Sequence, residues 1–546
     1  MSRTCPARRD DQVAHHQEIH QAGHQGPAPP ATVFCCLRLI QVSRTHQRMR
    51  ASVPAPADLQ TSPERRQVPG STKGAGMPFD LTRPLSWKTA TGDADTMLQN
   101  LQANILKGHV REHLHILLLH FDKGPEDPAE ARALLTGLVP LMKSAKTHLH
   151  EVRDFKQNGS KDESDTPPYV GVGLTKAGYE RLNLSAEAFS DDAFKRGMRA
   201  DETRANLKDP EIAQWEAGYQ EEIHAIVLVG GDKPGSVVTT LREVEDLLTD
   251  SIRVLGRETG RGLHDAANRG IEHFGYVDGR SQPLFLTEDL EEEGSRNGGT
   301  SVWDPGQGLE RVLVADPLAP NPATDFGSYF VLRKLEQNVR VFRQAEEDLA
   351  DALNLEGSDR ERAGAMLVGR FKDGTPLTLE ATPGAHNPVM NDFNYNDDLA
   401  ADKCPFQAHI RKTNPRGSGG FGVPLEKERR HLMARRGQTY GERSDGDLPE
   451  SGVGLLFMAF NSDLVDQFEF TQHSWANNAR FPDPHGEPNP GLDQVIGQGE
   501  GSRPPATWPR VWGEEEGQEV PAMAQAVTMK GGEYFFMPSL SFLRSL

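Results

Sequence analysis

Short apolar runs alternate with longer charged segments in the chain after Leu98. Residues 114–121 (LHILLLHF) and 225–230 (AIVLVG) have the length and composition that are typical of buried strands. Residues 129–143 and 211–223 lie between these runs and have the spacing and charge of helices. A β-α-β order that returns its strands to one sheet predicts an α+β unit of ferredoxin-like type.

The second half of the chain repeats this pattern. Residues 328–332 (SYFVL) predict a strand that leads into a charged helical segment at 333–353. Residues 454–460 (GLLFMAF) predict another strand, which a helical segment follows. We therefore expect two such units that share a cleft.

Irregular connections are expected at three places: 288–308, 317–324 and 480–509. The first two are acidic and rich in Gly and Pro, which is typical of surface loops. The third is long enough to be either a functional lid or a flexible excursion.

Residues 1–76 differ from the rest, because they are rich in His, Gln, Pro and Arg and lack a helical or strand period. We expect a disordered leader or a start codon assigned too far upstream. The apolar run at 33–40 is far shorter than the roughly 20 residues of a spanning helix. Arg8-Arg9 is followed by two aspartates rather than by an apolar signal region, so we expect a cytoplasmic protein, with export as the alternative.

The expected domains are this leader, an N-terminal half at 77–310 and a C-terminal half at 311–546. With 546 residues, 36% of them hydrophobic, the chain has ample material for a large core. The net charge of -19 disfavours nucleic acid or an anionic membrane as a partner, because the field of the protein repels both. Four cysteines are too few and too scattered for a disulfide framework.

Three stretches carry candidate chemistry, and each one alone has a plain structural interpretation. Asp278 precedes a glycine in 274–283 (FGYVDGRSQP), which is a common turn. His409 lies in 404–416 (CPFQAHIRKTNPR) outside any zinc-binding pattern, and a lone imidazole suits haem iron because the porphyrin supplies four other donors. The basic segment 429–441 (RRHLMARRGQTYG) fits either a glycine-capped helix end or a buried cation that faces an anion.

In combination these stretches resemble the dye-decolorizing peroxidase family. GYVDG, HIRKTNPR and RRGQTYG follow one another in the family's order. Further similar stretches are 101–109 (LQANILKGH), 327–339 (GSYFVLRKLEQNV), 470–478 (FTQHSWANN) and 531–539 (GGEYFFMPS). The resemblance covers residues from about 98 to 546. It implies two ferredoxin-like subdomains with antiparallel sheets, of the dimeric α/β-barrel type, that enclose one haem b per chain.

The resemblance also implies roles for single residues. Asp278 matches the distal catalytic acid, Arg435 the distal arginine and His409 the proximal iron ligand. Arg435 is preferred to Arg436 because it keeps the family's spacing to Tyr440. The other implied haem contacts are Arg416, which matches a propionate contact, and Gly279, Arg280, Leu455 and Phe457.

The implied activity is the reduction of hydrogen peroxide and the one-electron oxidation of dyes, phenolics or other small donors, through a ferryl iron and a porphyrin radical. An ionised aspartate can move the peroxide proton, and a guanidinium can stabilise the oxyanion that develops. Bulky donors would react at a surface aromatic, for which Tyr440 and then Trp475 are candidates; the alternative for each is a packed aromatic.

Two other functions remain open at this point, and so does oligomerisation. Haem binding, or release of iron from haem, without peroxidase turnover would need His409 but neither Asp278 nor Arg435. An α+β interaction protein without a cofactor would need none of the three. A homo-oligomer is compatible with the sequence.

Overall fold

The computed structural model describes residues 79–158, 167–296, 301–384, 389–419, 423–444, 446–482, 490–499 and 505–546. The predicted leader at 1–76 lies outside these residues. Chain contacts group Ala75–Leu546 in one unit. In the part that is described, no helix has the length and apolar character to cross a membrane.

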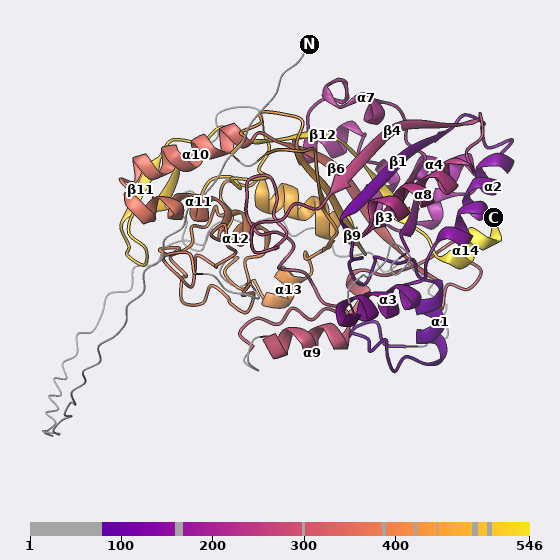
Figure 1. Ribbon diagram of the computed structural model, residues 1–546, viewed down its shortest axis with the longest axis horizontal. Coiled ribbons are helices and arrows are strands. Elements are labelled where there is room, and N and C mark those ends of the chain that lie inside the picture. The colour runs from indigo at the N-terminus through magenta and orange to yellow at the C-terminus, as the bar shows by residue number, and fades with distance from the viewer. Residues whose placement is uncertain are drawn as a thin grey trace, which may run out of the picture. The chain divides into compact units, whose positions relative to one another are not determined.

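One large antiparallel sheet contains strands from both ends of the chain (Figure 1). Its strands are β1 (His113–Phe121), β2 (Tyr169–Leu174), β3 (Ala225–Gly231), β4 (Ile252–Arg261), β5 (Val314–Ala315), β6 (Phe326–Gln337), β7 (Ala434–Arg435), β8 (Gln438–Tyr440), β9 (Gly454–Asn461) and β12 (Val527–Met537). A separate two-stranded sheet contains β10 (Ala506–Pro509) and β11 (Gly517–Val520).

The strands of the N-terminal part lie in the order β4-β1-β3-β2. The helices α2 (Ala129–Leu138) and α3 (Ala145–Asn158) connect β1 to β2, and α8 (Pro234–Glu245) connects β3 to β4. This is the strand order of a β-α-β-β-α-β unit. The uninterrupted apolar runs of β1 and β3 are explained by burial, since all seven residues of β3 are buried.

The strands of the C-terminal part repeat this order as β12-β6-β9-β8. The helix α10 (Val339–Ala352) follows β6, and two π-helical segments, η6 (Val465–Glu469) and η7 (Thr471–Ala476), follow β9. The expected ferredoxin-like topology is therefore confirmed in both parts.

The two units join into a closed sheet rather than remaining separate. Leu174 of β2 pairs with Phe536 of β12, and Gly260 of β4 pairs with Tyr440 of β8. The pairing of β6 with β9 inside the C-terminal unit completes the closed sheet. Each unit thus covers the edge strands of the other, which removes unpaired backbone groups from the sheet edges.

The remaining helices lie around this sheet. They are α1 (Gly92–Asn100), α4 (Lys176–Arg181), α5 (Asp192–Arg196), α6 (Asp201–Leu207), α7 (Ala217–Gln220), α9 (Thr287–Arg296), α11 (Arg360–Val368), α12 (His409–Thr413), α13 (Leu425–Arg429) and α14 (Leu540–Ser545). Figure 1 shows α10 and α11 together at one end of the molecule, and α2 beside α14 at the other.

Three expected elements differ in the structure. The helix expected at 211–223 is only a 3-10 turn and the short α7, because the chain is extended at Trp215 and Glu216, where the Glu216 amide donates to Lys530 O of β12 at 2.8 Å. The loop expected at 288–308 begins with the helix α9, which ion pairs such as Glu292–Arg296 support. Strand β6 continues to Gln337, five residues beyond the predicted end at 332.

Candidate active site

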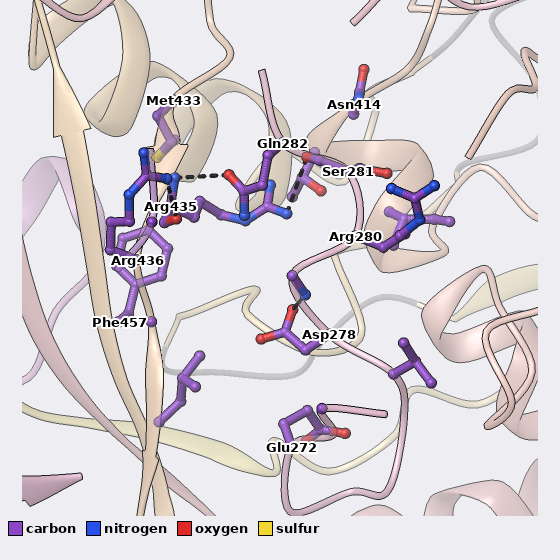
Figure 2. A pocket seen from close by; sticks show the side chains of 18 of the residues that line it. Glu272, Asp278, Arg280, Ser281, Gln282, Asn414, Met433, Arg435, Arg436 and Phe457 are labelled. Carbon is purple, nitrogen blue, oxygen red and sulfur yellow. Dashed lines mark hydrogen bonds between the residues drawn. The ribbon is translucent and has the colours of Figure 1, made fainter. Parts of the chain in front are cut away.

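A cavity of about 680 Å³ contains every residue that the sequence assigned to the site. Its lining comes from the loop after β4, from α12 and from strands β6 to β9. The assigned residues in this lining are Asp278, Gly279, Arg280, His409, Arg416, Arg435, Leu455 and Phe457. Residues that lie far apart in the chain are thus brought to one space, part of which Figure 2 shows.

The Asp278 carboxylate faces the cavity from a tight loop (Figure 2). Its Oδ1 accepts a hydrogen bond from the Gly279 amide at 2.6 Å, and its own amide donates to Gly270 O at 3.1 Å. Gly279 has φ +74°, a conformation that residues with a Cβ rarely adopt. The glycine therefore allows the chain to turn directly after the acid.

Arg435 and Arg436 lie side by side in sequence but have different surroundings. Arg436 donates to Asn104 O, Ile105 O and Arg435 O, each at 2.8 Å, so carbonyls occupy its guanidinium. Arg435 donates to Ser281 O at 3.3 Å, and its side chain lines the cavity. Burial lowers the pKa of Arg435, and the charge of Asp278 acts in the opposite direction.

His409 begins α12 and has a buried acidic partner. Its Nδ1 lies 2.9 Å from Oδ2 of Asp493, which is fully buried. Oδ1 of Asp493 accepts from the amides of Val495 and Ile496 at 2.8 Å. Burial opposes the charge of Asp493, but the imidazole and the two amides hold its pKa below the ordinary value. With Nδ1 engaged, Nε2 is the ring nitrogen that can bind a metal.

Sequence reasoning missed Asp493. It lies in the expected irregular connection at 480–509, 84 residues beyond His409, and no local motif marks it. A histidine that binds a metal usually donates its other ring N–H to an acceptor, but the position of that acceptor follows only from the tertiary structure.

Two buried arginines test whether the cavity suits a haem. Arg416 and Arg370 share the neutral acceptors Ser281 Oγ and Asn391 Oδ1, and within the described residues neither forms an ion pair. Burial lowers the pKa of Arg416 to about 9 and that of Arg370 to about 10. Buried cations without an anion are unfavourable, and the two propionates of a haem would supply the missing negative charges.

The apolar lining fits a porphyrin as well. Leu455 and Phe457 on β9 line the cavity together with Ile410, Val495 and Ile496. These side chains suit the flat hydrocarbon ring, while the imidazole suits the iron. The residues present therefore fit a haem.

Tyr440 and Trp475, the candidates for oxidation at the surface, both lie in the interior. The side chain of Tyr440 is 7% exposed beneath the ammonium of Lys334, and Trp475 is 3% exposed and stacks on Phe481. Both side chains are therefore packed aromatics of the interior, which was the alternative to oxidation at the surface.

Comparisons with known proteins agree with this geometry. Residues 100–262 match the family model of the DyP dimeric alpha+beta barrel domain. The chain is 57% identical over 479 residues to the multifunctional dye peroxidase DyP2 of Amycolatopsis sp. (strain ATCC 39116 / 75iv2); the match spans 86% of this chain and 100% of the relative.

Solved structures give the same result. The structure of DyP2 from Amycolatopsis sp. ATCC 39116 has a TM-score of 0.81 at 55% identity and covers 86% of this chain and 100% of its own. The DyP-type peroxidase of Anabaena sp. has a TM-score of 0.78 at 39% identity, with 85% and 97% covered.

The fold and the site together define a haem-dependent peroxidase of α+β barrel architecture. The chain belongs to the dye-decolorizing peroxidase family. The predictions of family, fold class and peroxidase activity are confirmed, and the relatives favour peroxidase activity over haem binding without turnover.

Proposed function

We propose that the chain binds one haem b in this cavity, with His409 as the iron ligand, and that Asp278 and Arg435 activate hydrogen peroxide there. The observation that carries this proposal is the composition of the cavity wall. One lining residue is a histidine held by a buried carboxylate, and two others are a carboxylate and a guanidinium that face the open space.

The bound haem would supply iron that exchanges electrons with peroxide. Asp278 would take a proton from one peroxide oxygen and return it to the other, which makes water the leaving group. The hydrogen bond from Gly279 holds one carboxylate oxygen in place and leaves the other for this transfer.

Arg435 would bind the peroxide anion and stabilise the negative charge that develops as the O–O bond breaks. A guanidinium keeps its charge at every working pH and presents several donors in a fixed plane. Removal of one such donor typically raises a barrier by about 3 kcal/mol.

His409 would bind iron through Nε2 and donate its Nδ1 proton to Asp493. This hydrogen bond fixes the tautomer and the orientation of the ring, and the negative charge makes the imidazole a stronger electron donor. Arg416, Arg370, Gly279, Arg280, Leu455 and Phe457 would contact the haem edge and faces.

The electron donors are proposed to be small molecules such as phenolics and dyes. Support comes from the relatives, several of which are named dye-decolorizing peroxidases. Cytoplasmic location, a homo-oligomer and the boundaries of the two halves stay predictions.

Stopped-flow kinetics with peroxide test the proposal directly. We expect Arg435→Leu to slow the reaction about 100-fold or more, Asp278→Asn to slow it as well, and His409→Ala to lose normal haem ligation. Arg430→Leu, an exposed arginine of the same basic segment, is the matched control and should react like wild type. Wild-type rates in both Asp278→Asn and Arg435→Leu would refute the assignment.

A further inference from the structure

Glu272 lies at the base of the loop that carries Asp278, and both side chains line the cavity (Figure 2). Oε2 of Glu272 accepts the amide of Phe274 at 2.7 Å, and Oε1 accepts the amide of Tyr276 at 3.0 Å. The chain therefore folds around this carboxyl group before it reaches Asp278. Asp278 closes the loop through its bond to Gly270.

In the part of the chain that the structure describes, Glu272 has no cationic partner, in contrast to three other acids of the cavity wall. The paired acids are Asp289 with Lys107, Glu292 with Lys156, and Glu293 with Arg280. Within the described residues Glu272 forms no ion pair, and its third donor is the neutral amide of Gln337 on β6. A buried carboxyl group without a cation is easier to keep protonated than ionised.

The charged groups that face Glu272 come from its own loop and from α10. Arg343 of α10 donates to Phe274 O and to Glu346, so its charge is already balanced by a carboxylate. Tyr276 donates its hydroxyl to the same Glu346. Burial raises the pKa of Glu272 to about 7, against the effect of its three donors, and the charge of Asp278 adds to this rise.

Gln337 can serve both protonation states of Glu272. Its Nε2 donates to Oε2 of Glu272, while its own Oε1 is buried and has no partner. A half-turn of the amide would place that oxygen against Glu272, where it could accept a hydrogen bond from the protonated acid. The loop can therefore keep its shape when Glu272 gains or loses a proton.

We propose that Glu272 is a positioning residue of the peroxide site. It fixes the loop that carries Asp278 through the amides of Phe274 and Tyr276, and it carries a proton in the active form of the site, while Asp278 serves as the base. Two acids whose surroundings differ in this way divide the roles of base and proton holder. The inference rests on the proposed function of Asp278.

The protonation of Glu272 should make the rate of the peroxide reaction depend on pH. As pH rises through about 7, Glu272 ionises and places a second negative charge in the cavity. This charge opposes the field of Arg435 and repels the peroxide anion, since like charges in one site disfavour each other. The rate of the peroxide reaction should then fall about tenfold between pH 6 and pH 8, as expected when a group must be protonated.

The variant Glu272→Gln, studied in the holoenzyme, tests whether Glu272 causes this pH dependence, because the amide removes the charge and keeps an oxygen acceptor. We expect its rate to change less than about twofold between pH 6 and pH 8, where wild type falls about tenfold. Glu112→Gln, which removes another acid of the cavity wall, is the control and should keep the wild-type fall. The proposal is overturned if Glu272→Gln keeps that fall too.

Infrared spectroscopy separates this inference from the proposed function of Asp278. We expect a protonated-carboxyl band that titrates near pH 7 in wild type and is absent in Glu272→Gln. Gln337→Leu should move its midpoint upward, because one donor to the ionised form is lost. A wild type without such a band overturns the proposal. A wild-type peroxide rate in Asp278→Asn, with the band still present, would instead refute the role of Asp278.

Discussion

Charged side chains in the cavity wall differ chiefly in whether they have a partner of opposite charge. His409 and Asp493 form a pair, whereas the buried Arg370 and Arg416 and the half-buried Glu272 have only neutral partners among the described residues. Burial of a lone charge is unfavourable, so such groups indicate either a missing ligand or an altered protonation state. The arginines fit the first case and the glutamate the second.

Asp493→Asn should raise the reduction potential of the iron and slow the peroxide reaction about 10- to 100-fold, because a neutral amide no longer strengthens the imidazole as a donor. A redox titration and stopped-flow kinetics measure the two effects. Asp316→Asn removes a buried acid that binds Ser539 instead, and it should leave the potential unchanged. An unchanged potential in Asp493→Asn would contradict the proposal that His409, the partner of Asp493, binds the iron.

Arg370→Met should weaken haem retention about tenfold or more, since a charge-assisted hydrogen bond contributes roughly 1.5–3 kcal/mol. Transfer of haem to an acceptor protein measures this loss. The haem-free variant should lose less stability than haem-free Arg333→Met, because Arg333 neutralises the buried Asp209. Equal haem retention in wild type and Arg370→Met would exclude Arg370 as a propionate contact.

At the scale of elements, buried charges on strands bind segments that are distant in the chain. Arg333 and Lys334 on β6 pair with Asp209 and Glu216, and Glu533 on β12 accepts the amide of Met198 at 2.8 Å. The charged residues at 333–337 were therefore predicted to lie on a helix, although they belong to strand β6. Their partners neutralise them only after the chain has folded.

Glu533→Gln should change how stability depends on pH. Burial raises the pKa of Glu533 from its ordinary 4.5 to about 7. The proton is therefore bound more tightly in the folded state, and the stabilisation present below pH 4.5 is lost as pH rises to about 7. Relative to wild type, the variant should gain about 3 kcal/mol between pH 4.5 and pH 8.

Denaturant unfolding of both proteins across this pH range measures the difference. The amide oxygen can still accept the Met198 and Tyr534 amides, both of which donate to Oε1, so the native contacts are retained. A constant stability difference at all pH values would show that Glu533 does not titrate in this range.

Strands with an uninterrupted apolar run were predictable, and elements shaped by a distant contact were not. The runs at β1, β3 and β9 follow from burial on both faces, which leaves no polar alternation. Residues 211–223 have helical spacing, but the chain is extended at Trp215 and Glu216, where Glu216 approaches Lys530 of β12 and Lys334 of β6. Local spacing contains no information about such an approach.

At the scale of the whole molecule, the strand pairings that close the sheet also bring together the two parts of the cavity wall. The pairings of β2 with β12 and of β4 with β8 join the two units, and the cavity is lined from both. His409 belongs to the C-terminal part and Asp278 to the N-terminal part, so each unit alone would lack one of the two residues. The peroxidase site therefore requires the joined sheet.

Removal of the haem should lower the stability of the whole chain. A ligand at about 100 times its Kd adds roughly 2.7 kcal/mol to the free energy of unfolding, and the empty cavity also keeps Arg370 and Arg416 without anions. Differential scanning calorimetry of the holo- and apoproteins measures the effect. Equal melting temperatures would indicate that no haem binds in this cavity.

The sequence by itself predicted the family and the α+β class, which are confirmed, and it singled out Asp278, His409 and Arg435 as the proposed site, because these depend on residue order and local pattern. Only the tertiary structure decided which other residues contact these three or share the cavity with them. No local motif marks Asp493, Arg370 or Glu272. Whether each of them has a partner of opposite charge depends on how distant segments of the chain approach one another. Charge and burial at a point in space belong to the folded chain, which is why no local pattern contains them.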